Sequence, residues 1–558
     1  MIIDKEIKES IKRLIRKSSQ NSIYELECII GNLNRDINTR DDFVNILKRI
    51  KGKSRFSRMV QNNSLLISFQ NENSPYSAIT KHLSRVSISG NGLISEYART
   101  NSLKNIIENV IFENKSYDNY SKDRLIDDNF NLRFNLKKEE ELDYNSVQIT
   151  NLVREWKQID KYFRKKLTYT FYEEENDFKI DISIISSSKK FTYSKTLQES
   201  DVLKNKYISY EIEIEYIGNK KENIKSLLNF NYNNNNVVIG KKEKEKKKEV
   251  EDYQNYILDK YLDIINILLR AKQKSLFVIG IKDKIKVNKS FKELIKSDID
   301  TYLPQPIDLE PQNIVELPIL NYFGNDYDKN IRMDYAVTTK ADGMRYLLFI
   351  DKDEINSYKY TGTQIKDFSN SLFDGELISK TMDGKFIQNY YIFDAYIVKG
   401  LNISSYIFGD KKDSKSRYFY VNKLEEHFAK SDSVLQEENI ESSYLLKIFK
   451  KNYFYGNQSD KIKDKLKEMS PKNIDKIKNK YDSKIFESIN KILKKCNVKY
   501  GGTLEDGHLY SYPLDGLIFQ PVNLGVNQNK VGEKVKKIGG TWKSGFRWKP
   551  PHELTIDF

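Results

Sequence analysis

Residues 211–215 read Glu-Ile-Glu-Ile-Glu, a strict alternation of acidic and apolar side chains. Successive side chains of a β-strand point to opposite faces, so Glu211, Glu213 and Glu215 share one face and the isoleucines share the other. Like charges about 6.6 Å apart along one strand repel each other unless a cation lies among them. The segment therefore predicts a strand with an apolar cover on one side and an acidic, cation-binding surface on the other.

Other segments between residues 18 and 230 repeat this pattern in short strands. Glu25 and Glu27 flank an apolar residue in the same way, and basic side chains take the polar positions elsewhere. The further charges expected on one face are Arg133, Arg164, Lys166, Lys179 and Asp181. A closed sheet with these charges inside and apolar residues outside, covered by helices, would form a hydrophilic tunnel. Its basic walls would bind a triphosphate and its acidic residues a metal.

A second pattern occupies residues 340–345, which read Lys-Ala-Asp-Gly-Met-Arg. We expect Lys340 to end a strand that runs into a turn at Gly343, where glycine lets the backbone approach a phosphate. A lysine with an ordinary pKa of about 10.4 is rarely deprotonated at pH 7. A nucleophilic lysine therefore needs neighbouring cations or a metal to lower its pKa. Arg345 and Lys549 are the candidates. The segment alone is also compatible with an ordinary polar turn.

Four later segments add groups that a nucleotide site requires. Glu376 lies on a predicted strand, where its carboxylate could take ribose hydroxyls or a hard metal ion. Phe393 could stack on a purine or pack in the core, and Asp515 offers a second metal carboxylate. Arg547 and Lys549 are two residues apart, so on a strand they would point the same way and clamp a phosphate.

In this order the segments resemble the covalent nucleotidyltransferase superfamily over roughly residues 300–558. Asp515 stands where ligases usually have Glu, and residues 547–551 (Arg-Trp-Lys-Pro-Pro) with the closing Thr-Ile-Asp-Phe are similar to mRNA capping enzymes of large DNA viruses, of the poxvirus, asfarvirus and mimivirus type. The resemblance implies these roles: Lys340 nucleophile, Arg345 and Glu376 on the ribose, Phe393 on the base, Asp515 on metal, Arg547 and Lys549 on phosphate. Arg547 replaces the usual lysine, which alters geometry. Thr339 offers a hydroxyl that could donate to guanine O6.

The tunnel pattern resembles the triphosphate tunnel metalloenzymes, specifically fungal and viral RNA triphosphatases, across about residues 20–230. The resemblance implies Mg²⁺ or Mn²⁺ bound by Glu25, Glu27, Glu211, Glu213 and Glu215, with Arg133, Arg164, Lys166, Lys179 and Asp181 as catalytic residues. It also places Arg99 and Lys115, loosely, on early strands. Ile29 stands where a related Glu-x-Glu-x-Lys branch has lysine, which disfavours a thiamine triphosphatase or a cyclase.

Composition is consistent with a soluble, nucleic-acid-binding protein. The formal charge is +15, which favours a polyanionic partner because Lys and Arg displace condensed counterions. The only cysteines, Cys28 and Cys496, lie outside any metal-ligand spacing and suit a reducing compartment. No apolar run reaches the ~20 residues of a membrane helix. We expect a cytoplasmic protein without a membrane partner, in a viral factory or virion if the source is viral.

We expect an α+β chain in three parts. Residues 1–235 form the antiparallel β tunnel, which a first helix at 2–17 precedes. Residues 236–300 form a linker and a connector helix. The segments 231–236 and 241–249 mark a polar junction, and we expect the helix over 252–271. Residues 301–558 form an ATP-grasp-like ligase/capping nucleotidyltransferase domain with a mostly helical segment at 422–495. In the resembled family an OB-fold domain follows; this chain ends at Phe558, so we expect that domain to be absent and adduct formation to be slow.

The sequence thus predicts a bifunctional mRNA 5′ capping enzyme. The tunnel would release the γ-phosphate of RNA through a metal-activated water, and the second domain would transfer GMP from GTP through Lys340. The expected partners are 5′-triphosphate RNA, GTP and a separate or C-terminal cap methyltransferase. Two alternatives stay open: an ATP-dependent polynucleotide ligase with an accessory N-terminal domain, and a basic RNA-binding scaffold with degenerate catalytic motifs.

Overall fold

The chain forms two compact units, Met1–Lys284 and Ile285–Phe558. The computed structural model describes residues 3–21, 23–31, 37–51, 55–69, 76–80, 83–190, 192–218, 241–275, 278–296, 302–314, 329–351, 368–381, 384, 386–435, 446–456, 484–496, 512–535 and 537–549. None of the helices in these ranges has the length and apolar character that crossing a membrane requires.

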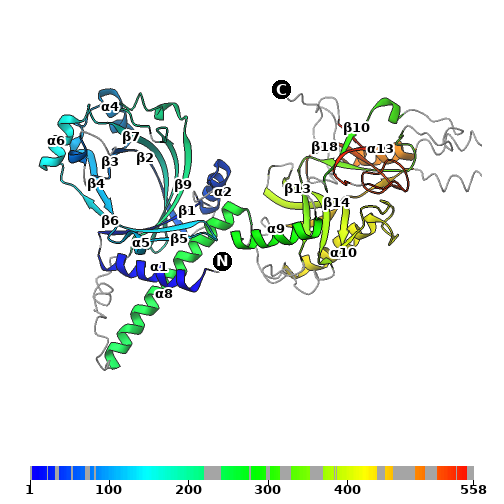
Figure 1. Cartoon of the computed structure of the whole chain (residues 1–558), viewed down its shortest axis with the longest axis horizontal. Helices are drawn as coiled ribbons and strands as arrows, with labels where there is room; N and C mark the ends of the chain where they lie inside the picture. Colours follow the sequence, from blue (N-terminus) through cyan, green and yellow to red (C-terminus); the bar gives the residue numbers. More distant parts are fainter. Residues whose placement is uncertain are drawn as a thin grey trace, which may run out of the picture. The chain divides into compact units, whose positions relative to one another are not determined.

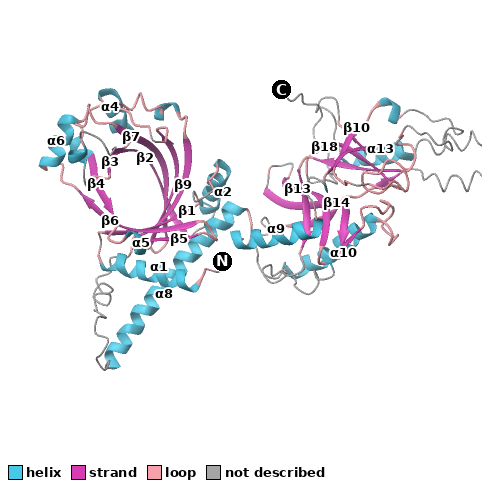
Figure 2. Cartoon of the chain, in the orientation of Figure 1, coloured by secondary structure: helices cyan, strands magenta, loops and turns pink. Residues whose placement is uncertain are grey.

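The first unit is built around one closed sheet. Its strands are β1 (Tyr24–Ile30), β2 (Phe56–Phe69), β3 (Arg85–Ser89), β4 (Val110–Ser116), β5 (Arg124–Asp127), β6 (Leu132–Glu141), β7 (Lys161–Glu173), β8 (Phe178–Ser187) and β9 (Ile208–Tyr216). They pair in the order β1-β9-β8-β7-β2-β3-β4-β6, β6 pairs back to β1, and β5 adds to β6. Figure 2 shows the resulting ring of strands. The predicted antiparallel tunnel fold is thereby confirmed as a closed barrel, which leaves the ring without a free edge.

The outer face of the barrel is apolar and carries helices. On β1, Leu26, Cys28 and Ile30 point outward into a core that they share with α1 (Lys5–Gln20), α2 (Arg40–Lys51) and α8 (Lys241–Gln273). Figure 1 shows α1 and α8 against this side of the ring. Tyr261 of α8 is fully buried and donates a hydrogen bond to the carbonyl of Ile214, 2.9 Å away. The helices therefore hold the strands so that alternate residues must face inward.

A second apolar cluster covers the opposite side, where α4 (Asn91–Thr100) and α6 (Val147–Glu155) pack on β2, β3 and β4. Lys161 is fully buried here, and its amine donates to the carbonyls of Trp156 and Ile159 at 2.7 and 2.6 Å. The remaining helical turns are α3 (Ser77–Thr80), η1 (Ile107–Asn109), α5 (Tyr120–Asp123) and η2 (Val202–Lys204).

The second unit contains two five-stranded sheets. One pairs β10 (Pro304–Asp308), β19 (Gly540–Trp548), β18 (Leu514–Pro521), β11 (Tyr335–Ala341) and β17 (Phe454–Tyr455). The other pairs β12 (Met344–Ile350), β13 (Ser371–Lys380), β14 (Phe386–Val398) and β15 (Leu401–Asn402), with β16 (Lys447–Lys450) on β14. The helical elements are α9 (Ile281–Ile295), which crosses the boundary between the units, η4 (Pro311–Asn313), α10 (Arg417–Leu435) and α13 (Lys484–Cys496). β11 passes through a short turn into β12, so the chain changes sheets directly after Lys340.

Several local expectations need correction. The first helix runs over Lys5–Gln20, and α8 begins at Lys241, so the expected linker 241–249 is helical. Pro304 and Pro306 lie in the edge strand β10, a position that tolerates proline. Between α10 and α13 lie the strands β16 and β17. Residues 231–236 and 457–483 lie outside the described residues.

Candidate functional site

The interior of the barrel carries the charged face that the sequence predicts. The inward-facing predicted residues are Glu25 and Glu27 on β1, Arg133 on β6, Arg164 and Lys166 on β7, Lys179 and Asp181 on β8, and Glu211, Glu213 and Glu215 on β9. Their neighbours in sequence lie in the outer apolar clusters. All ten are thus brought to one surface, the lining of the ring.

Acidic and basic side chains of this lining form pairs across strands. The pairs are Glu25 with Lys115 (2.5 Å), Glu27 with Lys137 (2.6 Å), Glu211 with Arg164 (2.6 Å), Glu213 with Lys166 (2.6 Å) and Glu215 with Lys179. Between 11% (Glu27) and 33% (Arg164) of each of these side chains is exposed. Because they are only partly buried, these charges remain available to a phosphate or a cation.

Two carboxylate pairs oppose each other directly. Glu27 lies opposite Glu215 on β9, and Glu213 lies opposite Asp181 on β8. Facing like charges destabilise a sheet unless they are neutralised. Burial raises the pKa of Glu215 to about 7, with Lys179 opposing the shift. Burial also acts to raise the pKa of Glu213, but the charge and hydrogen bond of Lys166 outweigh it and lower this pKa to about 2.

The opposed carboxylates suit a hard divalent cation. Mg²⁺ and Mn²⁺ prefer carboxylate oxygens, and Glu27, Glu213 and Glu215 supply them from adjacent strands. In the arrangement described here lysines occupy these oxygens, and among the residues that the structure describes no three acidic, His or Cys side chains form a ready ligand group. The donor chemistry therefore fits the ion, which would replace lysine contacts on binding.

Some lining residues escaped the sequence analysis. Lys137 was missed although it continues the alternation of Arg133 on β6, and Lys115, placed only loosely, pairs with Glu25. Arg85 lies opposite Glu113 and pairs with it. Their strands alternate less regularly in sequence. Arg133 has a buried Nε without a hydrogen-bond partner in the structure.

The expected position of Arg99 is wrong. The sequence analysis placed it loosely on an early strand, but it lies on helix α4, pairs with Glu96, and has a side chain that is 74% exposed. It is not part of the tunnel lining.

The second site forms around Lys340. Its amine lies 2.8 and 2.6 Å from the two carboxylate oxygens of Asp515, and Lys549 reaches the same carboxylate at 3.0 Å. Two glycines make this approach possible. A Cβ on Gly516 would lie 2.0 Å from the carbonyl oxygen of Trp548, and one on Gly343 would lie 2.8 Å from the carbonyl oxygen of Leu377. The carboxylate of Asp515 therefore bridges the amines of Lys340 and Lys549.

Arg345 does not hold the position expected of a free ribose ligand. Its guanidinium is bound by Asp374, donates to the carbonyl of Pro304 at 2.6 Å, and lies 5.5 Å from the ring centre of Phe393. Asp374 is fully buried and also accepts a hydrogen bond from the Tyr396 hydroxyl. Arg345 is thus fixed beside the proposed base-stacking ring.

Glu376 is placed toward the lysines of the site. Burial raises the pKa of the Glu376 carboxyl, while the charges of Lys451 and Lys340 oppose that shift. Phe393 lies on β14 and is half-buried, so one part of its ring remains accessible.

Arg547, one half of the expected phosphate clamp, is bound by a carboxylate of its own sheet. It lies opposite Asp308 of β10 and pairs with that carboxylate at 2.7 Å, with 42% of its side chain exposed. β19 ends at Trp548, so Lys549 lies beyond the strand, where the two-residue alternation no longer applies. The structure therefore brings Lys549, and not Arg547, to Asp515. Residues 550–558, part of the motif used in the sequence analysis, lie outside the described residues.

Lys451 is a site residue that sequence reasoning missed. It is 3% exposed, and its amine lies 3.3 Å from the carbonyl oxygen and 3.5 Å from the hydroxyl of Thr339. Tyr391 and Tyr512 flank the amine at 5.5 and 5.1 Å from their ring centres. The ammonium group of Lys451 is therefore a buried hydrogen-bond donor beside β11, the strand that carries Lys340.

No protein-family model matches the chain, and no curated protein matches it. Among solved structures, the chain is similar to the RNA triphosphatase domain of a trifunctional mimivirus mRNA capping enzyme, at 19% identity and a TM-score of 0.28, covering 40% of this chain and 94% of that one. It is also similar to the Schizosaccharomyces pombe RNA triphosphatase Pct1, at 11% identity and a TM-score of 0.27, covering 48% and 94%.

Proposed function

We propose that this chain is a bifunctional mRNA 5′ capping enzyme with an RNA triphosphatase in the first unit and a guanylyltransferase in the second. The observation that carries the proposal is the lining of the barrel, where opposed carboxylates such as Glu27 and Glu215 stand among basic side chains. A triphosphate needs several cationic partners, and a closed ring supplies them from all sides.

In the tunnel, Arg164, Lys166 and Lys179 would bind the phosphate oxygens and neutralise the charge that develops as the γ-phosphoryl group leaves. Glu27, Glu213 and Glu215 would hold Mg²⁺ or Mn²⁺. A cation bound there supplies charge stabilisation and an activated water. Release of lysines from their glutamates on metal binding would free their amines for the substrate.

In the second unit, the Nζ atom of Lys340 would attack the α-phosphorus of GTP. An N–P bond forms, the bond from the α-phosphorus to the bridging oxygen breaks, and pyrophosphate leaves with that electron pair. Asp515 is placed to receive the proton of the Lys340 ammonium, and Lys549 stands beside it to bind phosphate. The β-phosphate of the trimmed RNA would then take GMP from Lys340.

Guanine is favoured as the base because Thr339 and Lys451 present hydrogen-bond donors together. Guanine O6 accepts a hydrogen bond, whereas the adenine amino group at the same position donates one. Thr339 and Lys451 are both 3% exposed, and Lys451 is the stronger donor of the two because its ammonium group is charged. A Lys451→Met variant should lose preference for GTP over ATP.

The partners and setting follow from this proposal. They are 5′-triphosphate RNA, GTP, and a cap methyltransferase acting separately or from a further C-terminal domain. A large-DNA-virus source and a cytoplasmic location, in a viral factory or virion, are part of the same proposal.

Two labels test the proposal in one preparation. RNA carrying a γ-³²P label should release phosphate only with Mg²⁺ or Mn²⁺ present, and [α-³²P]GTP should label the chain covalently. Labelling by [α-³²P]ATP in place of GTP would indicate a ligase, and a chain that performs neither reaction would be a binding scaffold.

A further inference from the structure

One end of the barrel extends the basic lining with an aromatic side chain. The inward-facing row of β7 begins with Tyr162 and continues through Arg164 and Lys166. Tyr162 lies opposite Ser68, one residue before the end of β2, and the partner of Arg164 on β8 is Ser187, the last residue of that strand. Tyr162 therefore stands at the rim, one inward position beyond the basic row.

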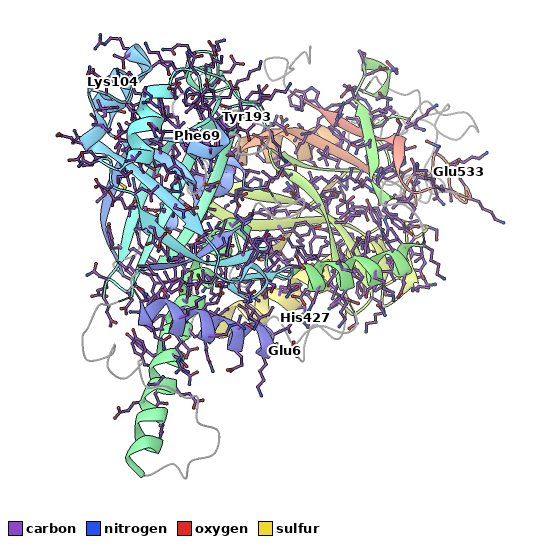
Figure 3. All side chains as sticks on the ribbon, turned by 60° about the vertical axis from the view of Figure 1, so that its left-hand side comes forward. Glu6, Phe69, Lys104, Tyr193, His427 and Glu533 are labelled. Atoms are coloured by element: carbon purple, nitrogen blue, oxygen red, sulfur yellow. The ribbon has the colours of Figure 1, made fainter. Side chains whose placement is uncertain are left out.

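A second tyrosine meets it from the segment 188–207. The rings of Tyr162 and Tyr193 pack edge to face, with centroids 6.1 Å apart, and Tyr193 is 37% exposed. Figure 3 labels Tyr193 near Phe69, the last residue of β2, at this end of the barrel.

The segment that carries Tyr193 is tied to β7. Lys161 and Ser194 exchange backbone hydrogen bonds of 2.9 Å in both directions, and Glu199 accepts from the backbone amides of Lys195 and Thr196. These hydrogen bonds hold Tyr193 in one position beside the rim. Binding of a ligand would therefore cost little conformational entropy in this segment.

The segment that carries Tyr193 is rich in lysine. Residues 188–207 contain five lysines and two acidic residues. Asp201 pairs with Lys204 and Lys206, while Lys189 and Lys195 are exposed. The rim is therefore net positive and aromatic.

Exposed aromatic rings within a positive groove form the usual surface for single-stranded nucleic acid, because bases stack on the rings and phosphates meet the lysines. We propose that Tyr162 and Tyr193 form a stacking platform for the first bases of an RNA whose 5′-triphosphate lies in the tunnel. This rests on the proposed triphosphatase function and adds to it that the substrate is an RNA end entering past β7, recognised without sequence preference.

The test compares substrates with and without a base. Tyr162→Ala and Tyr193→Ala should each lower kcat/KM for 5′-triphosphate RNA by about tenfold, since stacking on one ring contributes a factor of that order. Hydrolysis of inorganic tripolyphosphate, which has no base, should stay at the wild-type rate. Tyr193→Phe keeps the ring and should restore RNA cleavage.

Tyr120→Ala is the matched control, because Tyr120 is 56% exposed and also packs edge to face on a tyrosine of the barrel, Tyr117. It should leave both substrates unaffected. Quenching of 2-aminopurine at the first RNA position reports stacking without turnover, and it should weaken in both alanine variants.

Unchanged RNA cleavage and quenching in both alanine variants would overturn the platform, as would an equal loss on tripolyphosphate. A wild-type chain that cleaves neither substrate would instead contradict the triphosphatase proposal itself.

Discussion

Asp374 and Asp394 lie directly opposite each other on β13 and β14, and both are buried. Arg345 binds the first carboxylate, and Arg417, itself fully buried, binds the second at 2.7 and 3.1 Å. Arg417 also donates to the carbonyl of Leu524, which follows β18 of the other sheet. Removing one partner from such a buried pair leaves an uncompensated charge, so the two arginines fix the sheets that carry the proposed nucleotide site.

This arrangement predicts a role for Tyr396, whose hydroxyl donates to Asp374 beside Arg345. Tyr396→Phe should loosen Arg345 and raise KM for GTP about tenfold with a smaller change in kcat. Steady-state adduct formation measures both.

Tyr390→Phe provides the control for Tyr396. Its hydroxyl is on the same strand and donates to the backbone carbonyl of Tyr346 at 2.7 Å, so its loss costs stability by a similar amount, about 1 kcal/mol. If both variants shift KM equally, the effect is general loosening of the sheet and not positioning of Arg345.

Lys340→Ala should abolish the covalent GMP adduct, because it removes the proposed nucleophilic amine that β11 holds beside Asp515. Release of γ-phosphate from RNA should remain near the wild-type rate, since the tunnel lies in a separate unit. Lys543→Ala, an exposed lysine of β19, serves as the control and should label normally. Persistent labelling of the Lys340 variant would assign the nucleophile elsewhere.

The tunnel substitutions should show the opposite pattern. Glu27→Ala or Glu213→Ala removes an oxygen donor and strands a lysine, so metal-dependent γ-phosphate release should fall by about a hundredfold or more while GTP labelling continues. Glu140→Ala, a half-buried position of β6 that pairs with Lys138 and not with a lining residue, should retain activity. A triphosphatase rate unaffected by both lining variants would remove the proposed metal site.

The lining of the barrel could be predicted because it follows from a two-residue period that each strand carries locally. Glu211, Glu213 and Glu215 point inward for the same reason that the isoleucines between them point outward. Closure of the ring was predicted from this alternation and is confirmed.

The rest depended on contacts between distant segments. Lys451 reaches Thr339 only because β16 pairs parallel to β14, and its amide bonds to the carbonyl of Ile392 at 2.8 Å. The pairing of Arg547 with Asp308 could not be predicted, because the parallel partner strand β10 cannot be read from the local pattern. The local sequence pattern around Lys451 or Arg547 does not predict these contacts.

Lys161 makes the stability of the first unit depend on pH. Burial lowers the pKa of its amine to about 8, against 10.5 in the unfolded chain, with Asp160 and Glu199 opposing the shift. Between these two values the unfolded state binds more protons than the folded state, so the contribution of Lys161 to the free energy of unfolding rises with pH. Below pH 8 the charged amine of Lys161 lowers the free energy of unfolding. This penalty disappears by about pH 10.5, so the free energy of unfolding rises by up to about 3 kcal/mol.

Urea unfolding of a chain that keeps Trp156 as its one tryptophan, through Trp542→Phe and Trp548→Phe, reports on the first unit. Trp156 lies 5.0 Å from the Lys161 amine and is fully buried, so its emission should follow unfolding around this lysine. In Lys161→Met the rise between pH 8 and 10.5 should vanish relative to the parent. Lys165→Met, a partly exposed position on the same strand, should keep it. The same pH dependence in the Lys161 and Lys165 variants would mean that other groups titrate in this range and that the buried amine remains charged, held by the two carbonyls to which it donates.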